Sequence, residues 1–318
     1  MKAAARIVTI SLRTVRRFLF PLASCAWLAG WILNEQPPPW LWLYFIPAPL
    51  IAAWGLLEIL IHIRRASIHR KLFLIAMTGA AMVRTAVIDA RWNRPQKPPD
   101  DALRIVHWNI ARAHAGIVPV LQTIAPYRPD VVMLSEARNV IDLPFYSKRE
   151  LGLPFARSGD GMALLSRYSF FTLPSVPIEN GWAWAVRLQT PQGELDVVCA
   201  DIVSHPLIDR TASLAPLAKW LEERKDPTPL VLMGDFNTPR DARAFRPFRR
   251  HLVHAFESAG QGWPYTWPLP IPLYSIDHAW ISTNIVIHRY RLRDSPLSDH
   301  RRQLFEISLD AKSASVRE

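Results

Sequence analysis

Acidic and amide side chains follow a short apolar segment in the second half of the chain. Leu230–Met233 is bounded by Pro229 and by a Gly-Asp step, which predicts a buried strand that ends abruptly. Asp235 and Asn237 then share one tight loop. The carboxylate could orient or deprotonate a water molecule, and the amide could donate a hydrogen bond to an anionic oxygen. An ordinary Asx turn has the same composition, so this interpretation needs support from other segments.

Other predicted strands also end in polar residues that suit the same chemistry. Leu103–Ile110 alternates apolar and polar residues and carries Asn109 near its end. Asp130–Glu136 is typical of a buried strand with a carboxylate at its tip. A lone glutamate at a strand end is usually solvated. Paired with Asn109, Glu136 becomes a candidate oxygen ligand for a hard divalent cation.

The remaining elements alternate between predicted strands and helices, which indicates an α/β fold. The further predicted elements are strands at Gly161–Arg167, Trp184–Leu188, Leu195–Ile202, Ile276–Ile281, Ile285–Leu292 and Leu304–Leu309, and helices at Ile117–Ala125, at Asp209–Glu223 and within Arg243–Phe256. Ile276–Ile281 and Ile285–Leu292 are candidates for a strand pair. Asp277 lies in the first of these two strands, and Asp299 and His300 precede the last strand of the chain.

Polar residues at strand edges of an α/β fold can converge on one cleft. This set suits attack of water on a phosphate ester, because a cation held by carboxylate and amide oxygens would neutralise the phosphate. An Asp or an Asp-His pair would take the proton of the water, and amide and imidazole donors would stabilise the transition state. The candidate residues are Asn109, Glu136, Asp235, Asn237, Asp277, Asp299 and His300.

The order of these motifs resembles the endonuclease/exonuclease/phosphatase superfamily, which includes DNase I-like nucleases, apurinic endonucleases, sphingomyelinases and inositol-polyphosphate phosphatases. The resemblance covers residues 103–309, and its motifs are Trp108-Asn109, Ser135-Glu136, Gly234-Asp235-Phe236-Asn237, Ile276-Asp277-His278 and Ser298-Asp299-His300. It implies a four-layer α/β sandwich, in which two mixed β-sheets pack face to face with helices outside. It also implies Mg²⁺ or Mn²⁺ bound mainly at Glu136, with Asn109 and Asp299 nearby.

The resemblance also implies roles for the residues around the attacking water. Asp235 would orient or activate the water, and Asn237 would contact the phosphate. His300, hydrogen-bonded to Asp277, would be the other catalytic group. The sequence leaves open whether Asp235 or His300 is the base.

Two positions depart from the pattern of the superfamily. Many members carry a metal-assisting Asp where this chain has Ala111, and many carry a phosphate-binding His or Tyr where this chain has Asp201. Either His205 substitutes for that residue, or the Asp201 carboxylate occupies the site and disfavours an anionic substrate. Arg240 begins a series of arginines at helical spacing that favours a solvated basic face over a phosphate track. Arg240 is kept as a candidate substrate-binding residue.

Charge is distributed unevenly along the chain, whose formal net charge is +11. Residues 1–100 hold 13 Lys and Arg against 4 Asp and Glu, whereas residues 101–318 hold 25 against 23. The second part therefore lacks the overall charge of a non-specific DNA binder. The two cysteines, Cys25 and Cys199, offer neither a disulfide framework nor a zinc site.

The N-terminal hundred residues contain apolar stretches at Phe18–Leu33, Trp40–Ile63 and Leu72–Ile88. The second is long enough to cross a bilayer of about 30 Å, and the other two are near the short limit. A buried helical hairpin is the soluble alternative, but three successive stretches favour membrane insertion. Glu58 and Arg84 lie near predicted ends, where they could snorkel or pair with each other.

Basic residues set the expected orientation. The segment before the first apolar stretch and the connection between the second and third stretches are rich in Arg and Lys. The first connection, Asn34–Pro39, has neither. The positive-inside rule then places the N-terminus in the cytoplasm and everything after residue 88 outside, although Arg91, Arg94 and Lys97 argue mildly against this. The expected organisation is an anchor with three transmembrane helices (1–93), a linker (94–102), a catalytic domain (103–310) and a tail (311–318).

Together these patterns predict a divalent-metal-dependent phosphoesterase tethered to a bacterial inner membrane, with its catalytic domain outside the cytoplasm. A lipid headgroup is at least as plausible a substrate as nucleic acid, because tethering raises the effective concentration of a membrane substrate. The alternative is a catalytically weak phosphate-binding module on the same fold, which Ala111 and Asp201 favour. No protein partner follows from the sequence.

Overall fold

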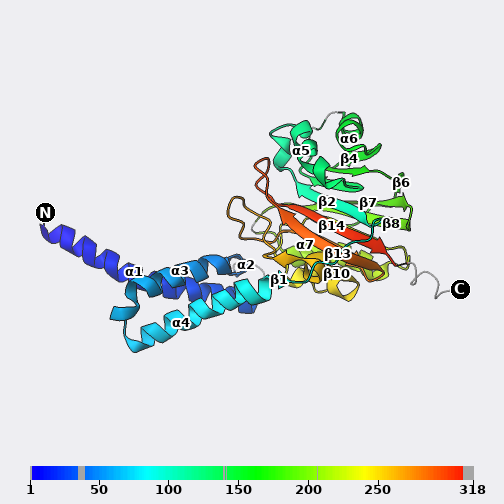
Figure 1. The fold of residues 1–318 in the computed structure, drawn as a ribbon. Helices are drawn as coiled ribbons and strands as arrows, with labels where there is room; N and C mark the ends of the chain where they lie inside the picture. The colour runs from blue at the N-terminus through cyan, green and yellow to red at the C-terminus, as the bar shows by residue number, and fades with distance from the viewer. Residues whose placement is uncertain (1, 35–39, 139, 141, 206, 311–318) are drawn as a thin grey trace. The chain divides into compact units, whose positions relative to one another are not determined.

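The computed structural model describes residues 2–34, 40–138, 140, 142–205 and 207–310. The chain divides into two compact units, Met1–Ala90 and Arg91–Glu318 (Figure 1). The expected tail, residues 311–318, and most of the first expected connection, residues 35–39, lie outside the described residues.

The first unit is helical. Its helices are α1 (Lys2–Leu33), α2 (Leu41–Tyr44), α3 (Ala48–His62) and α4 (Ile68–Val83), with a 3₁₀ turn η1 (Ile63–Arg65) and a π-helical turn η2 (Arg84–Asp89). Apolar side chains from three of these helices pack together, among them Phe20 and Trp27 of α1, Ile51 of α3, and Leu74 and Met77 of α4. The three helices therefore share one small core.

The expected second membrane span is wrong as a continuous helix. Trp40–Ile63 is broken around Pro47, which precedes α3 as its extended N-cap residue. Helix α3 has 15 residues and so spans only about 22 Å. Among the described residues, one helical segment, Ile68–Asp89, is long and apolar enough to cross a membrane. The expectation of three membrane-spanning helices stays a prediction.

Ionisable residues in this unit are paired locally. The nearly buried Glu58 carboxylate lies 3.4 Å from Arg70 Nη2 and 3.9 Å from His62 Nε2. Arg84 lies 3.1 Å from Asp89. Of the two alternatives for Glu58 and Arg84, pairing with each other does not occur, because Glu58 pairs with Arg70 and His62 and Arg84 pairs with Asp89.

Two six-stranded mixed sheets form the second unit. One has the order β10-β12-β9-β8-β7-β6 and the other the order β13-β14-β2-β3-β5-β4, and the pairs β8–β9 and β2–β3 are parallel. The strands are β1 (Arg91–Trp92), β2 (Leu103–Asn109), β3 (Val131–Ser135), β4 (Phe155–Gly159), β5 (Met162–Ser166), β6 (Phe170–Thr172), β7 (Gly181–Thr190), β8 (Gly193–Ile202), β9 (Leu230–Asp235), β10 (Leu252–His254), β11 (Gln261–Gly262), β12 (Asp277–Ser282), β13 (Ile285–Arg293) and β14 (Arg302–Leu309). Strands β1 and β11 form a small separate ribbon.

The main core lies between the two sheets. Ile105 and Met133 from one sheet and Val197 and Met233 from the other belong to one buried cluster. The helices of this unit are α5 (Ile117–Ile124), α6 (Leu143–Leu151), α7 (Arg210–Glu223) and α8 (Ala255–Ala259), with 3₁₀ turns η3 (Ala111–Ala113), η4 (Ala125–Tyr127), η5 (Arg243–Phe245) and η6 (Phe248–Arg250). Figure 1 shows α5 and α6 beside the β2–β4 sheet, where a second apolar cluster joins them to it. The predicted α/β fold of two mixed sheets flanked by helices is therefore confirmed.

Most predicted elements occur, with two exceptions. The helix expected within Arg243–Phe256 is instead η5, η6, β10 and the start of α8. The rings of Phe245 and Phe248 pack against Trp280, at centroid distances of 5.2 and 5.9 Å. These tertiary contacts occur where the sequence predicted a continuous helix. The expected pairing of Ile276–Ile281 with Ile285–Leu292 is also wrong, because β12 and β13 belong to different sheets.

The backbone beside Asp235 leaves no room for a side chain on Gly234. A Cβ there would lie 1.8 Å from the Ala200 carbonyl oxygen on the neighbouring strand. Gly234→Ala must therefore push β8 and β9 apart, and we expect a loss of about 1–3 kcal/mol in the free energy of unfolding. Urea denaturation measures it. Gly159→Ala, where a Cβ meets nothing within 4 Å, is the control, and equal stabilities of the two variants would contradict the prediction.

Candidate active site

Strand register brings acidic residues from distant parts of the sequence to one level. Asp235 at the end of β9 is paired with Asp201 of β8 on one side and with Asp277 of β12 on the other. In the facing sheet, the end of β2 places Asn109 opposite Ser135 of β3. Side chains at matched positions of neighbouring strands lie on the same face. The ends of β2, β3, β8 and β9 and the start of β12 therefore form one polar centre.

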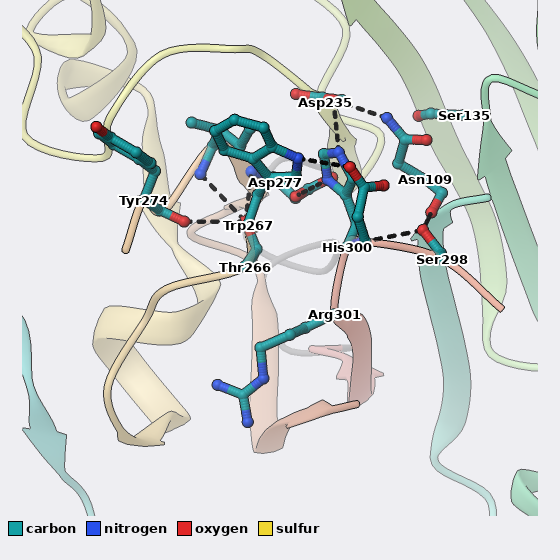
Figure 2. A network of polar contacts seen from close by, with 12 residues as sticks. Asn109, Ser135, Asp235, Thr266, Trp267, Tyr274, Asp277, Ser298, His300 and Arg301 are labelled. Carbon is teal, nitrogen blue, oxygen red and sulfur yellow. Dashed lines mark hydrogen bonds and ion pairs between the residues drawn. The ribbon is translucent and has the colours of Figure 1, made fainter. Parts of the chain in front are cut away.

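Asn109 links the two sheets across this centre. Its Nδ2 donates to Asp235 Oδ2 at 2.8 Å (Figure 2). The same Nδ2 donates to Glu136 Oε1 at 3.2 Å. The other Asp235 oxygen accepts a hydrogen bond from the backbone N–H of Asn237 at 2.9 Å. The Asn237 side chain donates to the Ile202 carbonyl at 2.8 Å. Asp235 is therefore fixed from both sides before any substrate arrives.

Asp277 and His300 form a buried ion pair. His300 Nδ1 lies 2.8 Å from Asp277 Oδ2, and His300 Nε2 lies 4.0 Å from Asp235 (Figure 2). Burial alone would lower the pKa of His300, but the charge and hydrogen bond of Asp277 and the charge of Asp235 raise it from 6.5 to about 10. Burial opposes ionisation of Asp277, yet His300 keeps the pKa of Asp277 below its usual value. Near neutral pH the pair is thus imidazolium and carboxylate.

The pKa of Asp235 is shifted in the opposite direction to that of Asp277. It is only 1% exposed, and burial together with the charges of Asp277 and Asp201 raises the pKa of Asp235 well above its usual value. A carboxylate of raised pKa accepts a proton more readily near neutral pH. The two acidic neighbours on β9 and β12 are therefore adapted to different tasks.

Several residues hold His300 in place without having been assigned a role from the sequence. Ser298 Oγ accepts a hydrogen bond from the His300 N–H at 3.0 Å and donates to the Asn109 carbonyl at 2.7 Å. Trp108 Nε1 donates to the His300 carbonyl at 3.0 Å. Thr266 Oγ1 accepts hydrogen bonds from the Ile276 and Asp277 backbones, both at 3.2 Å. In the sequence, the one signal for these contacts is the serine two residues before His300, because a serine side chain can accept a hydrogen bond from the backbone two positions further on.

Glu136 and Asp201 form the outer part of the centre. The backbone N–H of Glu136 donates to the Asp201 carboxylate, and burial and the charge of Glu136 raise the pKa of Asp201 to about 7. The Glu136 side chain is 36% exposed and lies 3.7 Å from Arg112 Nε. Of the two alternatives for this position, the structure places Asp201 at the centre. His205 is exposed, and its Nδ1 accepts a hydrogen bond from Leu207 N at 3.2 Å.

Left-handed backbone is concentrated in the loops of this centre. Ala111, Arg112 and Ala113 have φ values of 45°, 62° and 52°, and Glu136 and Asn237 have 51° and 45°. For non-glycine residues this conformation costs about 1–2 kcal/mol each. Ala111, at the position where an Asp was expected from the resemblance, donates its N–H to Asn109 Oδ1 at 3.0 Å. The backbone at Ala111 therefore helps to fix the Asn109 side chain, and it does not supply the metal ligand that an Asp would offer.

Besides His205, two predicted site residues do not join the cluster. Arg240 is 4% exposed; its guanidinium pairs with Glu257 at 3.5 Å and lies over the Phe256 ring. It is therefore buried in the protein and not exposed to a phosphate. Asp299 is exposed, and its carboxylate accepts a hydrogen bond from Trp267 Nε1 at 2.8 Å. Among the described residues no hydrogen bond or ion pair joins Asp299 to Glu136.

Two groups of side chains in this centre offer donor atoms for a divalent cation. Asp235, Asp277 and His300 each offer one ligand atom, and these atoms lie within 4.8 Å of one another. A protonated imidazole cannot coordinate a metal, and His300 is already bonded to Asp277. Glu136 and Asp201 instead bring two carboxylates together beside the Asn109 amide, and hard oxygen donors of this kind suit Mg²⁺ or Mn²⁺. This outer group fits a divalent cation better than the buried one.

The chain belongs to the endonuclease/exonuclease/phosphatase family, because residues 106–300, more than half of its length, match the family model. The match begins within β2 and ends at His300, so it contains Asn109, Glu136, Asp235 and Asp277 as well. Members of this family act on phosphoester substrates. No curated protein matches the chain significantly.

Solved structures show the same fold. An endonuclease/exonuclease/phosphatase from Beutenbergia cavernae DSM 12333 is 19% identical with a TM-score of 0.53, covering 66% of this chain and 72% of that one. The human Nocturnin catalytic domain with bound sulfate anion is 19% identical with a TM-score of 0.53, covering 68% and 100%. D. rerio TDP2 complexed with single strand DNA product is 17% identical with a TM-score of 0.51, covering 66% and 100%. At such identities the similarity shows the fold alone.

The Asp277–His300 pair predicts a specific dependence of stability on pH. Because the pKa of His300 rises from 6.5 to about 10 on folding, the stability that the pair contributes is complete below pH 6.5 and is lost as pH rises through about 10. Asp277→Asn should therefore cost about 3–5 kcal/mol below pH 6.5 and progressively less toward pH 10. Urea denaturation in EDTA across this range measures the difference.

Asp130→Asn is the matched control for that experiment. Asp130 pairs with Arg167 at 2.8 Å, and arginine does not titrate in this range. The cost of Asp130→Asn should therefore stay constant with pH. A constant cost for Asp277→Asn as well would show that His300 does not change its proton affinity on folding.

Proposed function

We propose that the chain is a divalent-metal-dependent phosphoesterase that hydrolyses a phosphodiester or phosphomonoester with an activated water molecule. The observation that carries this proposal is the position of Asp235, which is held by Asn109 and Asn237 and lies 4.0 Å from His300 Nε2. A proton acceptor and an imidazolium donor therefore face the same small space. That combination suits in-line attack on a phosphorus centre.

In this proposal Asp235 is the base and His300 the cationic donor. The raised pKa of Asp235 allows it to take a proton from water near neutral pH. The protonated His300, held by Asp277, can donate from Nε2 to an oxygen of the phosphate as negative charge develops there. Asn237, which is half-buried, would contact the phosphate once its amide leaves the Ile202 carbonyl.

Glu136, Asn109 and Asp201 are the residues that would hold Mg²⁺ or Mn²⁺. When bound, the cation would neutralise the phosphate and stabilise the leaving oxygen. Arg112, whose side chain is 68% exposed, can leave Glu136 at little cost because exposed ion pairs contribute little stability. Asp299 retains a supporting role, because its charge contributes to the raised pKa of His300.

Asp201 favours a second candidate function. With a carboxylate at this position the centre repels an anionic substrate unless a cation is bound or Asp201 is protonated. The pKa of Asp201, raised to about 7 by burial and by Glu136, leaves it partly ionised near neutrality. A weakly catalytic phosphate-binding module is therefore the alternative, and the measured rate decides between the two functions.

We further propose that the helical unit anchors the chain in a membrane and that the substrate is a phosphate ester at the membrane surface. Many large apolar side chains of this unit are exposed, including Leu22 at 66%, Ile32 at 73% and Leu60 at 80%. Such a surface is unusual in a soluble protein. The near-neutral charge of residues 101–318 favours a lipid headgroup over nucleic acid, although TDP2 was solved with a single strand DNA product.

Activity tests the catalytic proposal directly. Hydrolysis of bis-p-nitrophenyl phosphate should require Mg²⁺ or Mn²⁺ and stop with EDTA. Asp235→Asn and His300→Gln should each lower kcat by about 100-fold or more, because each removes a group that transfers or donates a proton. Asp294→Asn is the control, since Asp294 is exposed on the same loop as His300 and pairs with Arg301.

Unchanged rates in both site variants would eliminate the proposed centre. No metal-dependent turnover in the parent, together with metal-dependent binding of phosphate, would instead support the binding module. Plasmid DNA and phospholipid vesicles, added as competing substrates, distinguish the two substrate classes.

Membrane extraction tests the anchor. Full-length protein should stay with the membrane after alkaline carbonate treatment, whereas residues 91–318 alone should be released, because the long apolar helical segment Ile68–Asp89 and most of the exposed large apolar side chains lie in the first unit. A reporter fused after residue 318 tests the proposed extracytoplasmic location of the catalytic unit. A cytoplasmic reporter signal would reverse that topology, and release of the full-length chain by carbonate would remove the anchor.

A further inference from the structure

Two of the cavities formed by the described residues lie outside the candidate active site. The larger, of about 770 Å³, is lined by residues of both charge signs, and its Arg224 and Asp226 are already paired with Asp196 and Arg187. The smaller, of about 350 Å³, lies over β2, β14 and β13 and beside η4. Its lining differs in carrying an excess of unpaired positive charge.

Three guanidinium groups line the smaller cavity, those of Arg104, Arg128 and Arg291. Strand alternation explains how Arg291 reaches it. Tyr290 and Leu292 are buried in the core between the sheets, so Arg291 points to the opposite face of β13. Arg104 of β2 is half-buried and Arg128, which follows η4, is exposed. The three cations thus come from separate elements of the fold and meet at one cavity.

These arginines form no ion pair with the residues that the structure describes, although Glu306 of β14 lies opposite Arg104 of β2 in the strand register. Among the described residues, none of the three has a carboxylate within ion-pair distance. The one acidic residue in the lining, Glu306, pairs with Arg289 at 3.5 Å. The nearby Asp130 pairs with Arg167 at 2.8 Å. Burial and the charge of Arg289 lower the pKa of Arg291, and the charge of Glu306 only partly opposes this shift.

We propose that this cavity is a second, metal-independent binding site for a phosphate group. Arginine donors match the geometry of phosphate oxygens, and the volume lies in the range of small-ligand sites. Tyr127 offers an aromatic edge, and Val106 and Leu304 contribute apolar wall, so an organic phosphate fits better than a bare ion. Arg104 and Asn109 are five positions apart on β2, about 16 Å along the strand, which separates this cavity from the candidate active site.

Binding of soluble phosphates to the full-length chain in detergent tests the proposal. Isothermal titration with inorganic pyrophosphate and, separately, with monomeric dihexanoyl phosphatidic acid is carried out in EDTA, which removes any metal-dependent binding at the active site. We expect saturable binding of at least one of the two. Arg128→Gln and Arg291→Gln should each weaken it by about tenfold or more, because each removes charge-assisted hydrogen bonds.

Arg293→Gln is the matched control, because it changes the net charge by the same amount as the cavity variants. Arg293 is exposed on β13, like Arg291 a residue of that strand, but it is absent from the lining of the cavity. Arg128 is exposed, so its substitution leaves the fold intact even where that of Arg291 does not. Binding of pyrophosphate that only the cavity variants weaken supports a free phosphate ligand, and the same result with phosphatidic acid alone supports a lipid headgroup. No saturable binding, or equal weakening by Arg293→Gln, would overturn the proposal. Neither result depends on catalytic activity.

Discussion

The buried ion pair between Asp277 and His300 is the interaction on which the rest of the centre depends. Register places Asp201, Asp235 and Asp277 side by side on three neighbouring strands, and like charges so close cannot all be ionised without compensation. The imidazolium of His300 is the compensating cation within the buried part. Removing either partner of a buried pair leaves an unpaired charge, which costs far more than the pair itself contributes. The order of protonation in the whole centre therefore follows from this pair.

The backbone around the pair shows where this arrangement costs stability. Positive φ values at Ala111, Arg112, Ala113, Glu136 and Asn237 all fall in loops that follow the strands of the centre. Local strain of this kind persists only where the surroundings hold it in place. Here the two sheets do so, through a shared apolar core and through the hydrogen bonds of Asn109 across them. The rigid core thus supports a centre that by itself would relax.

Sequence patterns predicted the strands and their polar ends because both signals are local. The alternation in Leu103–Ile110 and the apolar run at Leu230–Met233 each identify a strand without reference to the rest of the fold. Partner choice is not local. Arg240 stands three residues from Asn237, yet Glu257 binds it, and Asp299, adjacent to His300, is turned to Trp267. The break at Pro47 was visible in the sequence, but the apolar composition on both sides outweighed it.

Net charge likewise conceals what a folded surface can do. Residues 101–318 are nearly neutral, which argues against binding a long polyanion through overall charge. Some of their charges, however, form pairs such as Arg187 with Asp196 and Arg167 with Asp130. The cations that form no ion pair then contribute most to the local potential, and three of them meet at one cavity. A near-neutral unit can therefore carry both an acidic centre that suits a cation and a basic cavity that suits an anion. Folding brings charges of one sign together locally even where the total charge is near zero.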